Sequence, residues 1–174
     1  MKARRARPAD ADVLYALIAG YAAEGLLLPR TLEEIRAHAD RFLLLVERAA
    51  KADGGTGETI LGCVALEPYG AELAEIRSLA VARELRGSGL GTHLVRFALA
   101  TARRRKFVRV FAVTHAPEFF VRQGFTTSAR QDVPEKIERD CVGCPKAKTC
   151  KLVAVIAQVS RDRVLPPVLA ELSA

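Results

Sequence analysis

The sequence lacks several features that would place it in a common class. It has no tryptophan, and aromatic residues make up 6% of its 174 residues, so stacking side chains for single-stranded nucleic acid are scarce. No apolar run reaches the roughly 18 residues of a membrane span. The basic start of the chain is not followed by the apolar core of a signal peptide. These absences predict a cytoplasmic protein that binds neither nucleic acid nor membranes.

Positive charge is in excess, with 27 Lys and Arg against 20 Asp and Glu, a net charge of +7. Such an excess attracts polyanions, which include nucleic acids, acidic lipid headgroups and phosphate-rich cofactors. The basic run at residues 103–106 ends a predicted helix, where the helix dipole favours each cation by about 0.3 to 1 kcal/mol. A solvated helix end therefore accounts for this run better than a nucleic-acid site, and a phosphate-bearing small molecule fits the charge at least as well.

The length predicts one domain over residues 1–174, large enough to bury about 70% of its unfolded surface. Residues 131–151 form a cysteine-containing insertion in this domain, and residues 160–174 form a C-terminal tail. Half of the residues are hydrophobic and charges of both signs are mixed, which excludes disorder as the main character of the chain.

The hydrophobic pattern alternates between strands and helices. An edge strand is expected over residues 2–7, and a helix capped by Asp10 or Asp12 should end near Gly25. The first helix should bury Val13, Leu14, Leu17, Ile18 and Tyr21. Thr31 and Glu34 form a capping-box pattern that opens a second helix, expected to run to about Asp40.

The middle of the chain predicts an antiparallel meander followed by a crossover. Strands are expected over residues 42–48, 60–66 and 74–81, with a glycine-rich loop at 51–59 and a stop at Pro68. A long amphipathic helix, a strand, a short helix and a final pair of strands should follow, at residues 89–106, 107–113, 117–122, 125–130 and 152–159. This pattern indicates an α/β (α+β) fold with a mixed, mostly antiparallel sheet flanked by helices.

The segment Arg86 to Gly91 reads R-G-S-G-L-G, directly after a predicted strand and directly before a predicted helix. Free backbone N–H groups at a helix N-terminus bind anions together with the helix dipole. Glycines also remove the Cβ atoms that would hold a pyrophosphate away. A tight turn that binds nothing is the alternative for such a loop taken alone. Neither the Rossmann spacing G-x-G-x-x-G nor the phosphate loop G-x-x-x-x-G-K-[ST] is present.

The element order and the R-x-x-G-x-G loop resemble the GNAT superfamily of N-acetyltransferases over nearly the whole chain. The run V-R-Q-G-F at residues 121–125 is similar to the late helix-to-strand turn of that superfamily. Three further runs resemble the acetyltransferase domain of N-acetylglutamate synthases, an enzyme of arginine biosynthesis: E-I-R-S-L-A-V (75–81), P-E-F-F (117–120) and V-P-E-K-I (133–137). The D-C-x-x-C-P-K run resembles short, stand-alone members of that group.

The resemblance implies acetyl-CoA as cosubstrate, with no metal required, and transfer of its acetyl group to the α-amine of an amino acid, most of all L-glutamate. It implies that backbone amides in the glycine loop hold the CoA pyrophosphate, at Arg86, Gly87, Ser88, Gly89, Leu90 and Gly91. The strand before the loop should pair with the pantetheine arm and polarise the thioester carbonyl, through Leu79, Ala80 and Val81.

The resemblance also implies the reacting groups. Glu75 matches the general base that takes a proton from the amine, acting through water; an outward-facing strand carboxylate is the alternative. Thr114 matches a hydroxyl position in the synthase group and could assist the thiolate leaving group, with His115 beside it; a structural strand end is equally compatible. Phe119 and Phe120 stand where many superfamily members place a tyrosine.

A glutamate acceptor carries two carboxylates, so its pocket should present cations. Arg30 matches the carboxylate-binding arginine of the synthase group, and Arg77, Lys136 and Lys148 are further candidates. A solvated surface position is the alternative for each of them taken singly.

Cys141, Cys144 and Cys150 offer three thiolates, whereas tetrahedral zinc prefers four ligands. Cys63 or His115 could complete the set only if the fold brings it close. Reduced thiols in a surface loop are therefore expected rather than a metal site.

Two other functions are compatible with the sequence. The chain could acetylate another amine, such as a different amino acid, a polyamine or a protein N-terminus, or it could bind acyl-CoA without catalysis. Exposed strand edges near the C-terminus are compatible with a homodimer.

Overall fold

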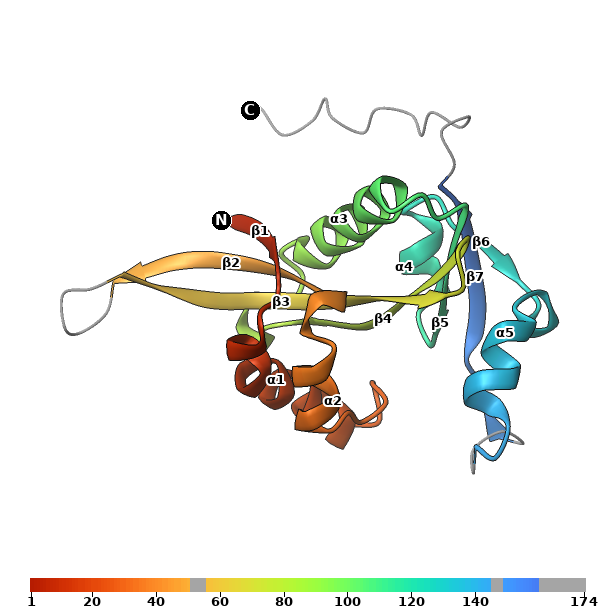
Figure 1. Ribbon diagram of the computed structural model, residues 1–174, viewed down its shortest axis with the longest axis horizontal. Coiled ribbons are helices and arrows are strands. Elements are labelled where there is room, and N and C mark those ends of the chain that lie inside the picture. The colour runs from red at the N-terminus through yellow and green to blue at the C-terminus, as the bar shows by residue number, and fades with distance from the viewer. Residues whose placement is uncertain (51–55, 145–148, 160–174) are drawn as a thin grey trace.

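A computed structural model of the chain describes residues 1–50, 56–144 and 149–159 (Figure 1). Its centre is one sheet in the order β1-β2-β3-β4-β5-β7-β6. Every neighbouring pair is antiparallel except β4 and β5, which are parallel. The strands are β1 (Lys2–Arg5), β2 (Phe42–Ala50), β3 (Thr56–Tyr69), β4 (Leu73–Val81), β5 (Arg109–Thr114), β6 (Thr126–Ser128) and β7 (Val153–Gln158). The expected mixed, mostly antiparallel sheet is confirmed.

Helices cover both faces of this sheet. The α-helices are α1 (Ala11–Ala23), α2 (Leu32–Ala37), α3 (Leu90–Arg104), α4 (Pro117–Val121) and α5 (Pro134–Lys136). A π-helical turn, η5 (Ile137–Cys141), continues α5, and short 3₁₀ turns are η1 (Pro8–Asp10), η2 (Ala39–Arg41), η3 (Arg83–Leu85) and η4 (Arg130–Asp132). Figure 1 shows α1 and α2 on one face, α3 and α4 on the other, and α5 beside β7.

Of the two N-terminal helices, α2 follows its sequence signal more closely than α1, where Asp10 stands at the N-cap position without a side-chain cap bond. In α2, the Thr31 hydroxyl accepts a bond from the Glu34 amide at 3.1 Å, and the Glu34 carboxylate accepts one from the Thr31 amide at 3.0 Å. This is the predicted capping box, although α2 ends at Ala37 and a 3₁₀ turn follows. The buried residues of α1 are Ala11, Leu14, Ile18 and Tyr21. The expectation that Val13 is buried was wrong, because it points about 100° away from Leu14 and is exposed.

The strand β3 is longer at both ends than the sequence suggested. It begins at Thr56, inside the expected loop, whose residues 51–55 lie outside the described part of the chain. It also continues through Pro68, which pairs with Ala74 of β4. The pairing of β3 with β2 stops at Ala65. At Pro68, β3 is therefore unpaired on its β2 side. Proline has no backbone N–H, and on an unpaired side this removes no hydrogen bond from the sheet.

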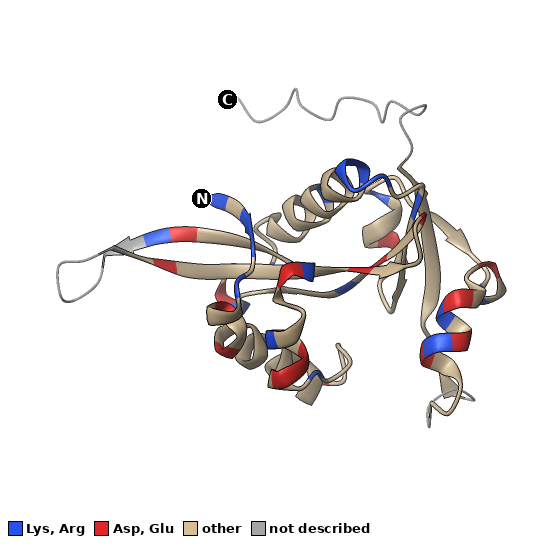
Figure 2. Ribbon diagram, viewed as in Figure 1, with Lys and Arg blue, Asp and Glu red and all other residues tan. Residues whose placement is uncertain are grey.

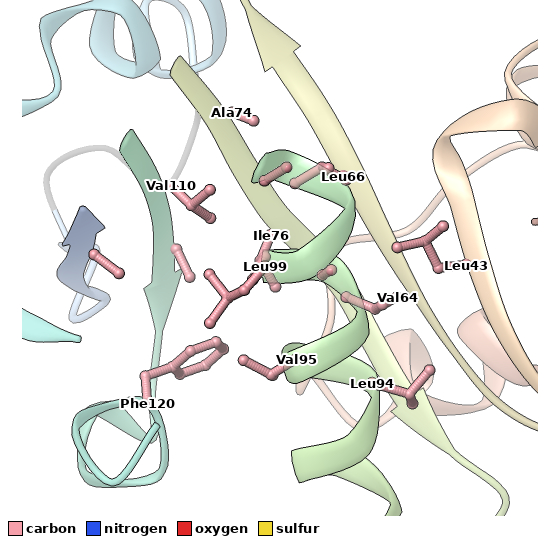
Figure 3. Close-up of a cluster of buried hydrophobic side chains, with 14 of the residues drawn as sticks. Leu43, Val64, Leu66, Ala74, Ile76, Leu94, Val95, Leu99, Val110 and Phe120 are labelled. Carbon is pink, nitrogen blue, oxygen red and sulfur yellow. The ribbon is translucent and has the colours of Figure 1, made fainter. Parts of the chain in front are cut away.

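The apolar run of β2 is buried on both faces. Leu43 and Leu45 belong to the core under α3 and α4, whereas Leu44 and Val46 belong to the core under α1 and α2. This division follows from the two-residue period of a strand. Figure 3 shows the first core, where strand residues such as Val64 meet α3.

The basic run at residues 103–106 lies at the C-terminal end of α3 (Figure 2). The Arg104 guanidinium lies 6.0 Å from the ring centre of Phe97, and that of Arg105 lies 5.2 Å from the ring centre of Phe107. These cations therefore pack on neighbouring rings at the negative end of the helix. None of the helices within the described residues has the length and apolar character needed to cross a bilayer.

Candidate active site

The glycine loop joins β4 to α3 and leaves backbone N–H groups free for a ligand. Gly87 and Gly89 have φ angles of +82° and +84°, a region that other residues adopt at a cost. The first backbone bond of α3 runs from the His93 amide to the Gly89 carbonyl at 3.2 Å. The amides of Leu90 and Gly91 therefore have no acceptor within the helix.

Not every amide of the loop points outward. The Arg86 amide donates to the Arg83 carbonyl at 3.2 Å and the Ser88 amide donates to the Leu85 carbonyl at 3.3 Å. These two bonds shape the turn. Of the six amides expected to contact a ligand, those of Gly87, Gly89, Leu90 and Gly91 are therefore better placed to do so. The space beside Gly87 and Gly89 is open, because a Cβ added at either position would have no described atom within 4 Å.

The sheet opens next to this loop. The parallel strands β4 and β5 are paired only from Leu73 to Glu75 on β4. From Ile76 to Val81, β4 has no partner on its β5 side among the described residues. The N–H and C=O groups of this stretch, which contains the expected Leu79, Ala80 and Val81, can pair with an extended ligand arm. Two carbonyls of this stretch are already engaged: that of Val81 accepts a bond from the Tyr21 hydroxyl at 2.7 Å, and that of Ser78 accepts one from the Cys63 thiol at 3.5 Å.

A bulge lies in the middle of the opened stretch. Cys63 pairs with Ala80 while Ala65 pairs with Arg77, so β4 carries one residue more than β3 between these pairs. Ser78 takes up the excess with a φ of +51°, and the register skips it together with Leu79. Backbone groups at the expected thioester position are therefore released from the ladder.

A pocket of about 480 Å³ lies beside the bulge. It is enclosed by the loop between α1 and α2, the middle of β4, the end of β5 and the segment before β7. Its charged and titratable lining residues are Arg30, Glu75, Arg77, His115, Lys136, Cys150 and Lys151. A second pocket of about 210 Å³ adjoins it, and Arg30, Arg77 and Ser78 line both.

Glu75 lies at the base of the larger pocket and is almost fully buried. The Lys136 ammonium lies 2.9 and 3.0 Å from its two carboxylate oxygens. The Tyr69 hydroxyl lies 3.0 Å from Oε2, and the Arg77 Nε lies 3.5 Å from the same oxygen. These partners satisfy the hydrogen-bonding capacity of a carboxylate that has been removed from water.

A second carboxylate, that of Asp140, shares these partners. Its Oδ2 accepts bonds from the Lys136 ammonium at 2.6 Å, the Tyr69 hydroxyl at 2.8 Å and the Arg77 guanidinium at 3.1 Å. Burial would raise the pKa of Asp140, but the Lys136 and Tyr69 hydrogen bonds outweigh it and hold that pKa well below its usual range. Burial, with the nearby Glu75 charge, raises the pKa of Tyr69, so this hydroxyl keeps its proton.

An outer shell of ion pairs surrounds this cluster. The Arg139 guanidinium lies 3.7 Å from the ring centre of Tyr69 and bonds to Glu67 at 3.0 Å. Glu67 also accepts a bond from Arg41 at 2.6 Å. In Figure 2, charges of both signs alternate along the α5 segment that supplies part of this cluster.

Arg30 and Lys151 line the larger pocket without a hydrogen bond or ion pair to a described residue, whereas Arg77 and Lys136 are paired with carboxylates. Burial lowers the pKa of Arg30, and the Arg77 charge acts in the same direction. A half-buried guanidinium that lines both pockets can bind an anionic group.

The remaining expected residues lie in different settings. Lys136 is buried and paired with two carboxylates, rather than open to an acceptor. The Thr114 hydroxyl accepts a bond from the Ala116 amide at 3.0 Å, and His115 beside it lines the pocket. Phe119 packs against the first turn of α3, where a Cβ added to Gly91 would lie 3.4 Å from its ring. Lys148 lies outside the described residues.

The cysteines of the insertion gather near Arg130. The Arg130 guanidinium lies 3.1 Å from the Cys141 sulfur and within electrostatic reach of Cys144 and Cys150. Within the described ranges, no group of three or more His, Cys, Asp or Glu residues could hold a metal ion. Cys63 is buried on the α1 side of the sheet, and burial raises the pKa of its thiol to about 12.

Sequence reasoning missed Tyr69 and Asp140 in the cluster, and it missed the surrounding ion pairs of Glu67 with Arg41 and Arg139. One signal was available, because Lys136 and Asp140 are four residues apart, a spacing that places both side chains on one helix face. Nothing in the sequence indicated that this face would lie against Glu75.

Comparisons with known proteins agree with this geometry. The family model described as "Acetyltransferase (GNAT) family" matches residues 14–125. A protein of Chlorobaculum tepidum named as an N-acetyltransferase is 37% identical over 153 residues, which cover 88% of this chain and 93% of that protein. The amino-acid acetyltransferase of Mycobacterium tuberculosis is 34% identical over 123 residues, covering 71% of this chain and 67% of that enzyme.

A solved structure of a related enzyme has a similar fold. The N-acetylglutamate synthase of Neisseria gonorrhoeae, complexed with coenzyme A and N-acetyl-glutamate, superposes with a TM-score of 0.77 at 26% identity. The match covers 92% of this chain but 35% of the synthase chain. This chain therefore corresponds to about a third of that enzyme.

Proposed function

Because the chain belongs to the GNAT family of acetyltransferases, we propose that it transfers acetyl to the α-amine of L-glutamate. The coarser activity is established: the chain is an acetyl-CoA-dependent N-acetyltransferase. The proposal concerns the acceptor and the residues that act on it, together with a place in arginine biosynthesis.

The observation that carries the proposal is the charge of the acceptor pocket. Its lining contains the cations Arg30, Arg77, Lys136 and Lys151 and the carboxylate Glu75, and Asp140 is bonded to two of these cations. The balance is 4 − 2 = +2. Glutamate with a neutral amine carries two carboxylates, so it would neutralise this pocket, with Arg30 as the first partner.

The proposal gives Glu75 the role of general base. An amino acid arrives as an ammonium ion and must lose a proton before its nitrogen attacks. Tyr69 and Lys136 already contact the Glu75 oxygens, so a bridging water is the fitting route for this proton. The amine nitrogen then forms a bond to the acetyl carbonyl carbon, the carbon–sulfur bond breaks, and the thiolate of CoA leaves.

The opened edge of β4 would hold the other reactant. A backbone N–H near Leu79 or Ala80, beside the bulge at Ser78, would donate to the thioester carbonyl. The amides of the glycine loop would hold the pyrophosphate. Thr114 or His115, at the end of β5, would assist the departing thiolate.

A free-thiol assay over a set of amines tests the acceptor. Glutamine is the matched control for glutamate, because it has the same length and one carboxylate fewer. We expect kcat/KM for glutamate to exceed that for glutamine, other amino acids and polyamines by at least about tenfold, since a charge-assisted bond contributes about 1.5 to 3 kcal/mol. Equal rates for glutamate and glutamine would exclude the proposed acceptor.

The variant Arg30→Gln tests the binding role. We expect KM for glutamate to rise about tenfold or more, for the same energetic reason, while the Kd for CoA stays unchanged. An unchanged KM would remove Arg30 from the site.

A further inference from the structure

Glu75 and Asp140 are two carboxylates that share the same partners. Lys136 donates to both, at 2.9 to 3.0 Å and at 2.6 Å. The Tyr69 hydroxyl lies within 3.0 Å of both, although it has one proton to donate. Asp140 is therefore tied to the immediate surroundings of Glu75, although the two residues lie far apart in the sequence.

The shared partners balance the charge of the cluster. Glu75 and Asp140 carry two negative charges, and Lys136 and Arg77 carry two positive charges. A carboxylate surrounded by two cations alone is a poor base, because cations stabilise its ionised form. A second carboxylate nearby acts in the opposite direction, because like charges disfavour ionisation.

We propose that Asp140 is a positioning residue that keeps Glu75 basic, by neutralising one of the two cations that contact it. This inference rests on the proposed role of Glu75 as the general base. The stronger contacts of Lys136 and Arg77 go to Asp140: 2.6 Å against 2.9 Å for Lys136, and 3.1 Å against 3.5 Å for Arg77. Asp140 thus draws both cations partly away from Glu75.

The charged and titratable groups around Glu75 come from several elements, whereas β5 presents the apolar Phe111 opposite it. Tyr69 comes from β3, Arg77 from β4, Lys136 from α5 and Asp140 from η5. Arg30 acts electrostatically from the loop before α2, and Glu67 lies opposite Glu75 in the β3–β4 register. Glu67 is neutralised by its own pairs with Arg41 and Arg139, so Asp140 is the carboxylate that shares partners with Glu75.

A charge cycle on the cluster tests the proposal. Asp140→Asn leaves Glu75 among two cations, and Lys136→Met leaves two carboxylates with one cation. We expect the acid limb of the kcat/KM profile to move to lower pH in the first variant and to higher pH in the second, each by about one pH unit. In the double variant, the cluster is again neutral and the limb should return close to its wild-type position.

The plateau rate gives a second readout. A weaker base transfers a proton less readily, so kcat of Asp140→Asn should fall about tenfold while the Kd for CoA stays unchanged. A purely structural role would lower activity without moving the limb. An unmoved limb in a folded, CoA-binding Asp140→Asn enzyme would overturn the proposal, as would a shift of both single variants in the same direction.

Asp132→Asn is the matched control. Asp132 lies in the same insertion and accepts bonds from the Ser128 hydroxyl at 2.6 Å and the Ala129 amide at 3.0 Å, without contact to the cluster. It should leave the acid limb in place. A limb that moves as far in Asp132→Asn as in Asp140→Asn would show that loosening the insertion, and not the charge, is responsible.

A direct titration separates this proposal from the choice of substrate. The Glu75 carboxyl can be followed by ¹³C NMR in protein with labelled glutamate, assigned with Glu75→Gln. The NMR signal of this carboxyl should titrate at lower pH in Asp140→Asn and at higher pH in Lys136→Met, even though no turnover takes place. If glutamate fails as acceptor but these shifts are found, the proposed substrate is wrong and the role of Asp140 stands. Unmoved NMR titrations in both folded variants would overturn that role, whatever the acceptor is.

Discussion

The two sides of the candidate site are built in different ways. The cofactor side consists of backbone: amides of the glycine loop at the start of α3, and the unpaired edge of β4. The acceptor side consists of side chains from β3, β4, α5 and η5, joined by bonds of 2.6 to 3.1 Å. The family match at residues 14–125 contains the whole cofactor side but ends before Lys136 and Asp140.

This difference shows which part of the enzyme is general and which is particular. A backbone cradle recognises a pyrophosphate through geometry that a short motif specifies. A buried side-chain cluster recognises an acceptor through charges that depend on residues far apart in the sequence. Substitutions on the cofactor side should therefore change the affinity for CoA, whereas substitutions on the acceptor side should change turnover.

The largest expected effect separates the sides most clearly. Glu75→Gln removes the proposed base but keeps its size, so kcat should fall by about 10² to 10⁴, while the Kd for CoA changes less than about twofold. Steady-state kinetics together with calorimetric CoA titration measure both quantities. A parallel loss of CoA binding would show that the two sides are not independent.

The reciprocal experiment is Gly89→Ala on the cofactor side. Its φ of +84° costs a residue with a Cβ about 1 to 2 kcal/mol, so the Kd for CoA should rise about tenfold. At saturating acetyl-CoA, kcat should stay within about threefold of wild type. If kcat falls and the Kd for CoA is unchanged, the loop does not hold the pyrophosphate.

Gly62 tests the contact between β3 and the end of β4. A Cβ at this position would lie 2.7 Å from the Ala80 carbonyl oxygen and 3.1 Å from the Leu94 side chain. Gly62→Ala should therefore lower the free energy of unfolding by about 1 to 3 kcal/mol, visible as a Tm lower by roughly 3 to 10 °C. Gly20→Ala in α1 is the control, because the φ of Gly20 is not in the left-handed region and a Cβ added there would lie 3.6 Å from the Arg83 side chain, an ordinary contact. A Tm loss in Gly62→Ala no larger than in the control would contradict this prediction.

The smallest expected effect concerns stability and pH. The pKa of Asp140 is lowered in the folded protein from its ordinary value of 3.8. Its carboxylate therefore stabilises the fold above the unfolded pKa and loses this contribution as pH falls toward the folded value. Asp140→Asn should thus be less stable by about 1 to 2 kcal/mol near pH 7. Denaturant unfolding at several pH values should show this gap closing below about pH 4. A gap independent of pH would mean that the charge of Asp140 does not stabilise the fold.

The sequence predicted the order of the elements, the capping box at Thr31 and the placement of the glycine loop, because each depends on residues close together along the chain. The expectation that the strand stops at Pro68 was wrong. A strand tolerates proline where its neighbour has ended, and the point at which β2 ends beside β3 depends on the tertiary fold. The sequence assigned Lys136 to the acceptor without its carboxylate partners for the same reason. A charge pattern reveals which residues are ionic but not which of them meet, so Tyr69 and Asp140 were missed.

The short pairing between β4 and β5 has a mechanical consequence. Three residue pairs, from Leu73 to Glu75, join the half of the sheet that ends in β4 to the half that begins with β5. Beyond Glu75, β4 has no partner on its β5 side among the described residues, so this short seam is the natural axis for a rotation of one part of the sheet against the other. We expect such a rotation to widen the gap between β4 and β5 for a departing product while Glu75, the proposed base, moves little, because displacement grows with distance from the axis.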